Sequence, residues 1–179
     1  SKSGYSMVRV LNNKFQTSTK WNIRNEQIPE CYNDGIRTFI YVDDLIGSGE
    51  QIINVLKEAP IAAYEDLNVY VCVCAAHERG INNIHDIFPS VKILTAEYIP
   101  VATDIFANIY EVLGYESRDA LREWYESFMK TNGARGLYNI YGRGDLGLVY
   151  AFQDNTPNNS LPILYFHNDN LAKLLNKRG

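Results

Sequence analysis

Two patterns of apolar residues follow each other along the first half of the chain. Residues 39–42 and 67–75 are nearly continuous apolar runs, as in buried strands of a parallel sheet, and 91–95 is a shorter run. Residues 51–59 and 81–88 instead carry apolar side chains at helical spacing. This alternation predicts an α/β fold with a doubly wound, mostly parallel sheet.

The alternation stops at residues 101–131, where two helical stripes follow one another. A helical hairpin inserted into the α/β fold explains this pattern most simply. We expect it to serve packing, with a lid or a partner surface as the alternative. The stripes are Ile105, Ile109, Val112 and Leu113, then Leu121, Trp124, Phe128 and Met129.

Length and composition narrow the class of protein. The 179 residues are 46% hydrophobic, which predicts one globular domain over residues 1–179. A net charge of −4 argues against an extended nucleic-acid surface, and no apolar run reaches the roughly 18 residues of a membrane span. Cys31, Cys72 and Cys74 lack zinc-site spacing, so we expect free thiols and a cytoplasmic location.

The end of the first apolar run carries the strongest functional signal. Asp43 and Asp44 close the run, and Gly47-Ser48-Gly49 leads from them into the next helix. Adjacent carboxylates resist burial and are tolerated where they face a ligand. Loop amides, a serine hydroxyl and a helix N-terminus suit a phosphate. The segment therefore predicts a site for a phosphorylated sugar.

Residues 42–51 resemble the phosphoribosyl pyrophosphate (PRPP) motif of type I phosphoribosyltransferases. That motif is an apolar strand, two acids, two variable residues and a Thr-Thr-Gly-x-Thr loop. The resemblance implies that Asp43 and Asp44 hold the ribose hydroxyls. It also implies that the loop holds the 5′-phosphate, through Gly47, Ser48, Gly49, Glu50 and Gln51. Gly47 and Gln51 replace hydroxyl residues of the motif, which bears on catalysis more than on binding.

Two further segments extend the resemblance. Lys2-Ser3-Gly4 precedes a helical pattern and is similar to the family's pyrophosphate loop, although a frayed chain end explains it equally well. Residues 155–162 follow a predicted strand at 146–152 and are similar to a string in a divergent family from bacterial phage-defence systems, some of them retron-associated. There Asn155 and Thr156 would contact substrate, and a capped turn is the equal alternative.

In sheets of this class, ligands lie beyond the carboxyl ends of the strands. We therefore expect Asp43, Asp44, His77, Glu78 and Asn155 on one edge. By resemblance, an acceptor attacks C1 of PRPP as pyrophosphate leaves, and Mg²⁺ is bridged by substrate oxygens without direct side-chain ligands. Lys2 and Arg143 would offset the pyrophosphate charge. The family also carries an earlier strand and a hood, which we expect this sequence to lack.

Several other functions compete with transfer of ribose 5-phosphate as readings of these residues. A P-loop is excluded because no Gly-Lys-Ser/Thr follows the glycines. A receiver domain would lack the Gly-Ser-Gly loop, and a Cys-His hydrolase would need a better placed pair than Cys74 and His77. The serious rival is a domain that binds PRPP or a nucleotide without turnover, as a sensor or as an interaction module of a defence complex with protein partners.

Overall fold

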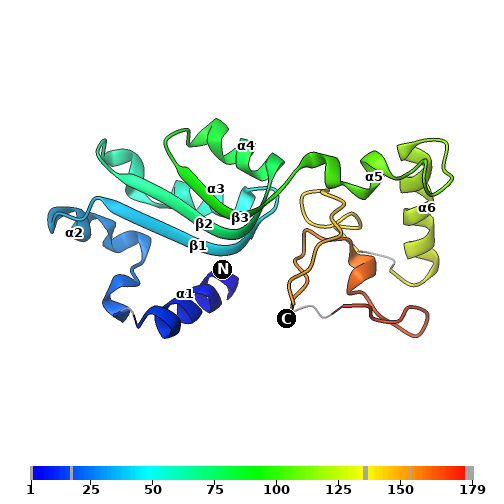
Figure 1. Ribbon diagram of the computed structural model, residues 1–179, viewed down its shortest axis with the longest axis horizontal. Coiled ribbons are helices and arrows are strands. Elements are labelled where there is room, and N and C mark those ends of the chain that lie inside the picture. Colours follow the sequence, from blue (N-terminus) through cyan, green and yellow to red (C-terminus); the bar gives the residue numbers. More distant parts are fainter. Residues whose placement is uncertain (1, 17, 135–136, 154, 176–179) are drawn as a thin grey trace. The chain divides into compact units, whose positions relative to one another are not determined.

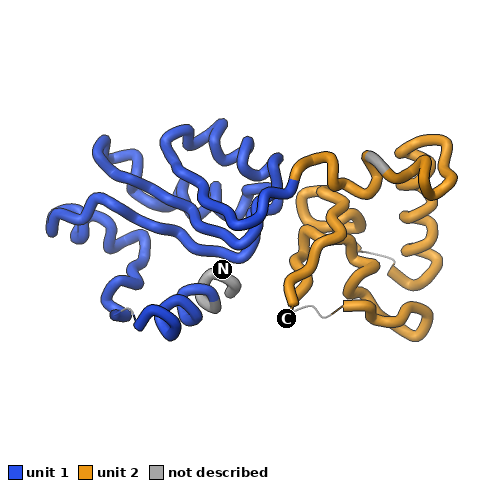
Figure 2. Tube along the Cα trace, in the orientation of Figure 1, with its two compact units in different colours: residues 1–99 blue, residues 100–179 orange. Residues whose placement is uncertain are grey.

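The computed structural model describes residues 2–16, 18–134, 137–153 and 155–175, without the side chains of residues 2–6 and 108. The chain forms two compact units, Ser1–Ile99 and Pro100–Gly179 (Figure 2), which are described separately below. That residues 1–179 form a single domain stays a prediction. Among the helices of the described residues, none is long and apolar enough to cross a membrane.

The first unit is built on a parallel sheet of three strands in the order β1-β2-β3 (Figure 1). The strands are β1 (Thr38–Ile46), β2 (Asn68–His77) and β3 (Lys92–Ile99). The register pairs Phe39 with Val69 and Val71 with Ile93, so branched and aromatic side chains stack across the sheet. The predicted parallel α/β fold is confirmed, and β3 continues beyond its predicted end at Thr95.

Helices flank this sheet. Two helices connect successive strands: α3 (Glu50–Glu58) joins β1 to β2, and α4 (Glu78–Ile87) joins β2 to β3. The helix α1 (Lys2–Phe15) lies beside β1 on the face of the sheet opposite these two helices (Figure 1). The remaining elements of the unit are α2 (Ile28–Asn33) and the short 3-10 helices η1 (Thr19–Trp21), η2 (Asn25–Gln27) and η3 (Pro60–Ala63).

The core of the first unit lies between the sheet and the two crossover helices. Ile52 and Leu56 of α3 and Ile84 of α4 are buried in one cluster with Val71 of β2. Each such aliphatic side chain contributes about 1.5–3 kcal/mol on burial. On the opposite face, Ile40 is 60% exposed, so α1 covers that face only in part.

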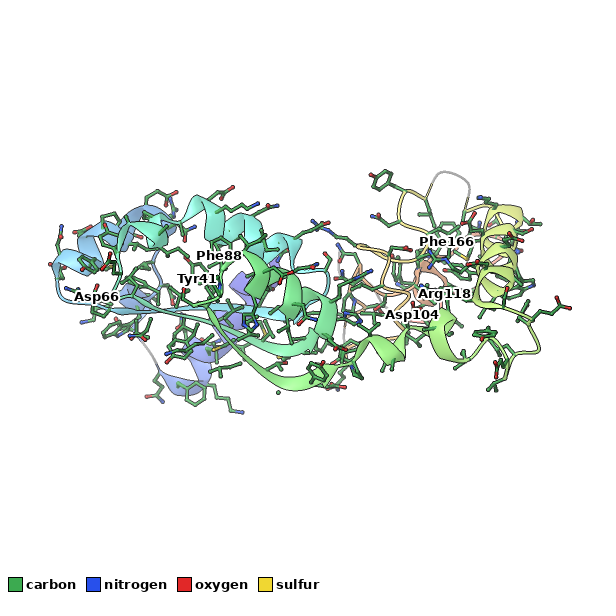
Figure 3. The ribbon with its side chains drawn as sticks, turned by 90° about the horizontal axis from the view of Figure 1, so that it is seen from above. Tyr41, Asp66, Phe88, Asp104, Arg118 and Phe166 are labelled. Atoms are coloured by element: carbon green, nitrogen blue, oxygen red, sulfur yellow. The ribbon has the colours of Figure 1, made fainter. Side chains whose placement is uncertain are left out.

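The second unit has little regular structure. Its helices are α5 (Ile105–Asn108) and α6 (Arg118–Thr131), with the 3-10 helices η4 (Val101–Thr103) and η5 (Pro162–Leu164). Asp104, the N-cap of α5, pairs with Arg118 at the start of α6 at 3.1 Å (Figure 3). The core of this unit is aromatic and aliphatic: Phe106, Leu121, Tyr125, Met129, Ala134 and Leu161.

Two predicted elements of this unit are wrong in part. The first helix of the expected hairpin is reduced to the short α5, and turns follow it up to Gly114, whose φ is +79°. Val112 is 84% exposed there, so no burial stabilises a longer helix. The strand expected at 146–152 is reduced to isolated bridges, because Gly147 has a φ of +59° and interrupts the extended backbone.

Candidate functional site

The loop between β1 and α3 is compact and well covered. Gly47, Ser48 and Gly49 are all buried. Gly49 is the N-cap of α3 with a φ of +84°, a left-handed conformation that glycine adopts at no steric cost. Its carbonyl accepts the bond from the Ile53 amide at 2.9 Å that starts the helix. Glu50 is thus the first residue of α3 and Gln51 the second, so the helix begins one residue earlier than expected.

Asp43 is the more buried of the two acids, at 2% exposure. Its Oδ2 accepts a hydrogen bond from the Gln51 side-chain amide, and its Oδ1 accepts one from the backbone N–H of Asp44 at 3.0 Å. These bonds offset the desolvation of a buried carboxylate. Asp43 therefore ties the end of β1 to the first turn of α3.

Asp44 lies in a different environment. Asp44 is the less buried acid, and its carboxyl lies near that of Asp43. It is half-buried, and its Oδ1 accepts the Leu45 backbone N–H at 2.8 Å. Burial and the charge of Asp43 raise the pKa of the Asp44 carboxyl above its ordinary value. A partly accessible carboxylate with a raised pKa is suited to accept hydrogen bonds from a ligand.

The start of α4 packs directly on the Gly47–Gly49 loop. A Cβ added to Gly80 would lie 2.1 Å from the Gly47 carbonyl oxygen, and one added to Gly49 would lie 2.7 Å from the Gly80 carbonyl oxygen. The Asn83 side-chain amide also donates to the Ser48 carbonyl at 2.9 Å. The sequence analysis did not predict that Gly80 and Asn83 contact this loop. A glycine in the first turn of a helix was the feature that could have indicated the role of Gly80.

The end of β2 supplies a histidine next to this loop. His77 is 2% exposed and is the N-cap of α4, where its Nδ1 accepts the Arg79 backbone N–H at 3.2 Å.

Burial, with a smaller effect from the Asp44 charge, raises the pKa of the Cys74 thiol. A raised thiol pKa and a histidine used as a cap do not favour the Cys-His hydrolase.

The structure brings some predicted site residues together and leaves others apart. Asp43, Asp44 and residues 47–51 form one continuous edge of the first unit. The backbone of Lys2, Ser3 and Gly4 forms the first turn of α1 rather than the expected loop, because the helical pattern extends to Lys2. Their contact with substrate remains a prediction.

Asn155 and Thr156 belong to the second unit. Thr156 is 1% exposed, and residues that follow it make hydrogen bonds within the second unit. Asn159 donates to the Arg143 carbonyl at 2.8 Å, and Ser160 donates to the Tyr150 carbonyl at 2.6 Å. These bonds favour the capped turn for this string. Contact of Asn155, Thr156 and Arg143 with substrate stays a prediction.

The resemblance predicts Mg²⁺ at this edge without direct side-chain ligands. No group of three or more His, Cys, Asp or Glu suited to a metal ion occurs among the described residues. Asp44 is the half-buried carboxylate nearest the loop in sequence. Binding of Mg²⁺ at this edge remains a prediction from the resemblance.

In this parallel α/β unit the first strand carries two adjacent acids near its end, and a Gly-Ser-Gly loop then leads to a helix N-terminus. These features define a domain of phosphoribosyltransferase type. The sequence profile of PRTase-CE matches residues 1–177, and the chain belongs to this phosphoribosyltransferase-like family.

Other comparisons add little. No curated protein matches the chain. Among solved structures, the AQ2163 protein from Aquifex aeolicus is similar at 23% identity and a TM-score of 0.31. The match covers 36% of this chain and 31% of that one, so this chain spans less than a third of that protein.

Proposed function

We propose that the β1–α3 edge binds PRPP or a nucleotide phosphate and that the chain transfers ribose 5-phosphate with release of pyrophosphate. The observation that supports this most is the position of Asp44. It is a half-buried carboxylate with a raised pKa, three residues before a glycine loop that opens a helix. Membership of the family supports the same chemistry.

Each part of the edge has a role in this proposal. Asp44 accepts hydrogen bonds from the ribose hydroxyls and stabilises positive charge that develops on the sugar. The amides of residues 47–49, the Ser48 hydroxyl and the N-terminus of α3 bind the 5′-phosphate. Mg²⁺ held mainly by the substrate and water would offset the charge of the pyrophosphate, and the protein mainly orients the substrate.

Asp43 has a different task from Asp44. Its oxygens already accept bonds from Gln51 and from the Asp44 backbone N–H, and it is almost inaccessible. It acts as a positioning residue that fixes the loop relative to β1. The two acids of the motif are therefore not equivalent in this chain.

A second candidate function is binding without turnover, as a sensor or as an interaction module. The Gln51 side chain favours it. Where the family motif has a hydroxyl for the phosphate, this chain has an amide that is engaged by Asp43. A role in a bacterial anti-phage system, retron-associated or not, belongs to both candidates and follows from the resemblance alone.

Pyrophosphate release separates these candidates. The protein is incubated with PRPP, Mg²⁺ and each of the common nucleobases, and pyrophosphate is followed with a coupled assay. Transfer predicts release with at least one base, which is lost in Asp44→Asn and kept in Asp34→Asn, a change of an exposed acid at the end of α2. Binding of PRPP without release under any condition supports the second candidate.

A further inference from the structure

The helix α4 fixes the direction of two successive carbonyl groups in the loop between β1 and α3. The Gly47 carbonyl points at Gly80, because a Cβ added there would lie closer to the carbonyl oxygen than to its carbon, which is 3.0 Å away. The Ser48 carbonyl accepts a hydrogen bond from the Asn83 side-chain amide at 2.9 Å. Gly80 and Asn83 are three positions apart on α4, so one face of this helix receives both carbonyls.

The directions of these carbonyls determine where the next two N–H groups point. In a trans peptide the C=O and the N–H point in opposite directions. The N–H of Ser48 therefore points away from Gly80, and the N–H of Gly49 points away from Asn83. Successive backbone N–H groups that leave a loop on the same side form a concave donor group that binds anions.

The donors of this loop are available to a ligand. Across the described ranges, no hydrogen bond to another residue is donated by the backbone N–H of Ser48 or of Gly49. The Ser48 residue is 9% exposed, and its hydroxyl likewise makes no hydrogen bond within those ranges. Nearly buried donors of this kind are costly unless an acceptor reaches them, which suits them to a phosphate.

The backbone of Gly49 explains why the loop needs an external contact to hold this arrangement. Rotation of the peptide between Ser48 and Gly49 changes mainly ψ of Ser48 and φ of Gly49. The φ of Gly49 is +84°, and glycine adopts positive and negative φ about equally readily. Local sterics therefore do not fix this peptide, and the hydrogen bond from Asn83 selects the orientation that turns its N–H away from α4.

We propose that Asn83 is a positioning residue for phosphate, which holds the Gly49 N–H toward the 5′-phosphate of the bound ligand. This inference rests on the proposed function, because the ligand is the phosphorylated sugar assigned to the β1–α3 edge. Asn83 acts through the Ser48 carbonyl and does not itself contact the substrate. Without its amide the peptide is free to rotate, and a carbonyl oxygen directed at the phosphate would repel it.

Titration of PRPP with Mg²⁺ into matched variants tests this role. Asn83→Ala removes the donor, and we expect the affinity measured by calorimetry to fall about tenfold. Asn83→Gln keeps an amide donor on a longer side chain and should recover part of that loss. Asn82→Ala changes an exposed neighbour on α4 and should bind PRPP as the native chain does.

Amide NMR separates a positioning role from a general loss of structure. In proton–nitrogen correlation spectra of the native chain, saturating PRPP should shift the Ser48 and Gly49 resonances downfield, because both N–H groups gain a charged acceptor. In Asn83→Ala the shift of Gly49 at saturation should be smaller. The midpoint of urea denaturation should match that of Asn82→Ala, since both side chains are exposed.

The outcomes distinguish this inference from the proposed function. Absence of PRPP binding to the native chain overturns both. Binding by the native chain with equal affinity in Asn83→Ala, or with an equal loss in Asn82→Ala, overturns the role of Asn83 alone. Weaker binding by Asn83→Ala with an unchanged Gly49 shift also overturns that role, because the peptide would then keep its orientation without the amide.

Discussion

The side-chain amide of Gln51 donates a hydrogen bond to the carboxylate of Asp43, which is 2% exposed. The bond joins the first turn of α3 to the end of β1 across the intervening loop. Gln51, which replaces a hydroxyl residue of the family motif, thus stabilises Asp43, the first acid of that motif. The bond supplies a donor to the buried Asp43 carboxylate where the two acids stand next to each other in β1.

Loss of this bond should destabilise the fold. Gln51→Leu leaves the buried Asp43 carboxylate with one fewer donor, and we expect the free energy of unfolding to fall by about 1–3 kcal/mol. Urea denaturation measures the change. Asn54→Ala, an exposed position on the same helix, should stay within about 0.5 kcal/mol. Equal stability of Gln51→Leu and the native chain would contradict the role of this bond.

The packing of α4 on the loop gives a second prediction. In Gly80→Ala the new Cβ would lie 2.1 Å from the Gly47 carbonyl oxygen, which is backbone and cannot rotate away. We expect a loss of about 1–3 kcal/mol in the free energy of unfolding. Asn82→Ala, an exposed position beside it on α4, is the control. A Gly80→Ala variant as stable as the control would show that the close approach does not persist in solution.

The α/β unit could be predicted from the sequence because its signals are local. The apolar runs of β1 and β2 and the stripe Ile52, Ile53 and Leu56 report burial on one or both faces of short elements. The contact of Gly80 with Gly47 could not be predicted, because it joins segments more than 30 residues apart and depends on how α4 crosses the sheet.

Asp44 should make stability depend on pH. Burial and the Asp43 charge raise its pKa in the folded protein, so the folded state holds the proton more tightly than the unfolded chain. The free energy of unfolding should therefore fall as the pH rises from about 4, the unfolded value, through the raised pKa, and the loss is complete above it.

Asp44→Asn removes this titration. The variant should be more stable than the native chain at pH 7, and its advantage should shrink as the pH falls toward 4 and the native carboxyl takes up its proton. Denaturation with urea at both pH values measures the difference. An advantage that is absent at pH 7, or larger at pH 4, would contradict the assignment of the raised pKa.

In the second unit, Arg122 joins an ion pair to an aromatic stack. Its Nη2 lies 2.9 Å from Asp145 Oδ1, and its guanidinium lies 3.7 Å from the centre of the Tyr141 ring. Arg122→Lys keeps the charge but loses the planar stack, so we expect about 1 kcal/mol of destabilisation, or roughly 2–4 °C in Tm. Lys130→Ala, which breaks an exposed pair with Glu126, should change Tm less. Equal shifts would contradict the importance of the stack.

The second unit was the harder part to predict. Ile109, Val112 and Leu113 have helical spacing, yet they lie in turns, because periodicity alone does not supply the burial that stabilises a helix. The predicted strand at 146–152 failed at Gly147, whose backbone conformation the apolar pattern did not reveal. Within the candidate site, the sequence located Asp43 and Asp44 but could not tell which one is buried.

The most direct test of the central proposal is calorimetric titration of PRPP with Mg²⁺ into the native chain, Asp44→Asn and Asp34→Asn. We predict binding by the native chain and by Asp34→Asn, with affinity reduced about tenfold or more in Asp44→Asn, equivalent to about 1.4 kcal/mol. Absence of binding to the native chain, or equal affinity in Asp44→Asn, would contradict a PRPP site at the β1–α3 edge.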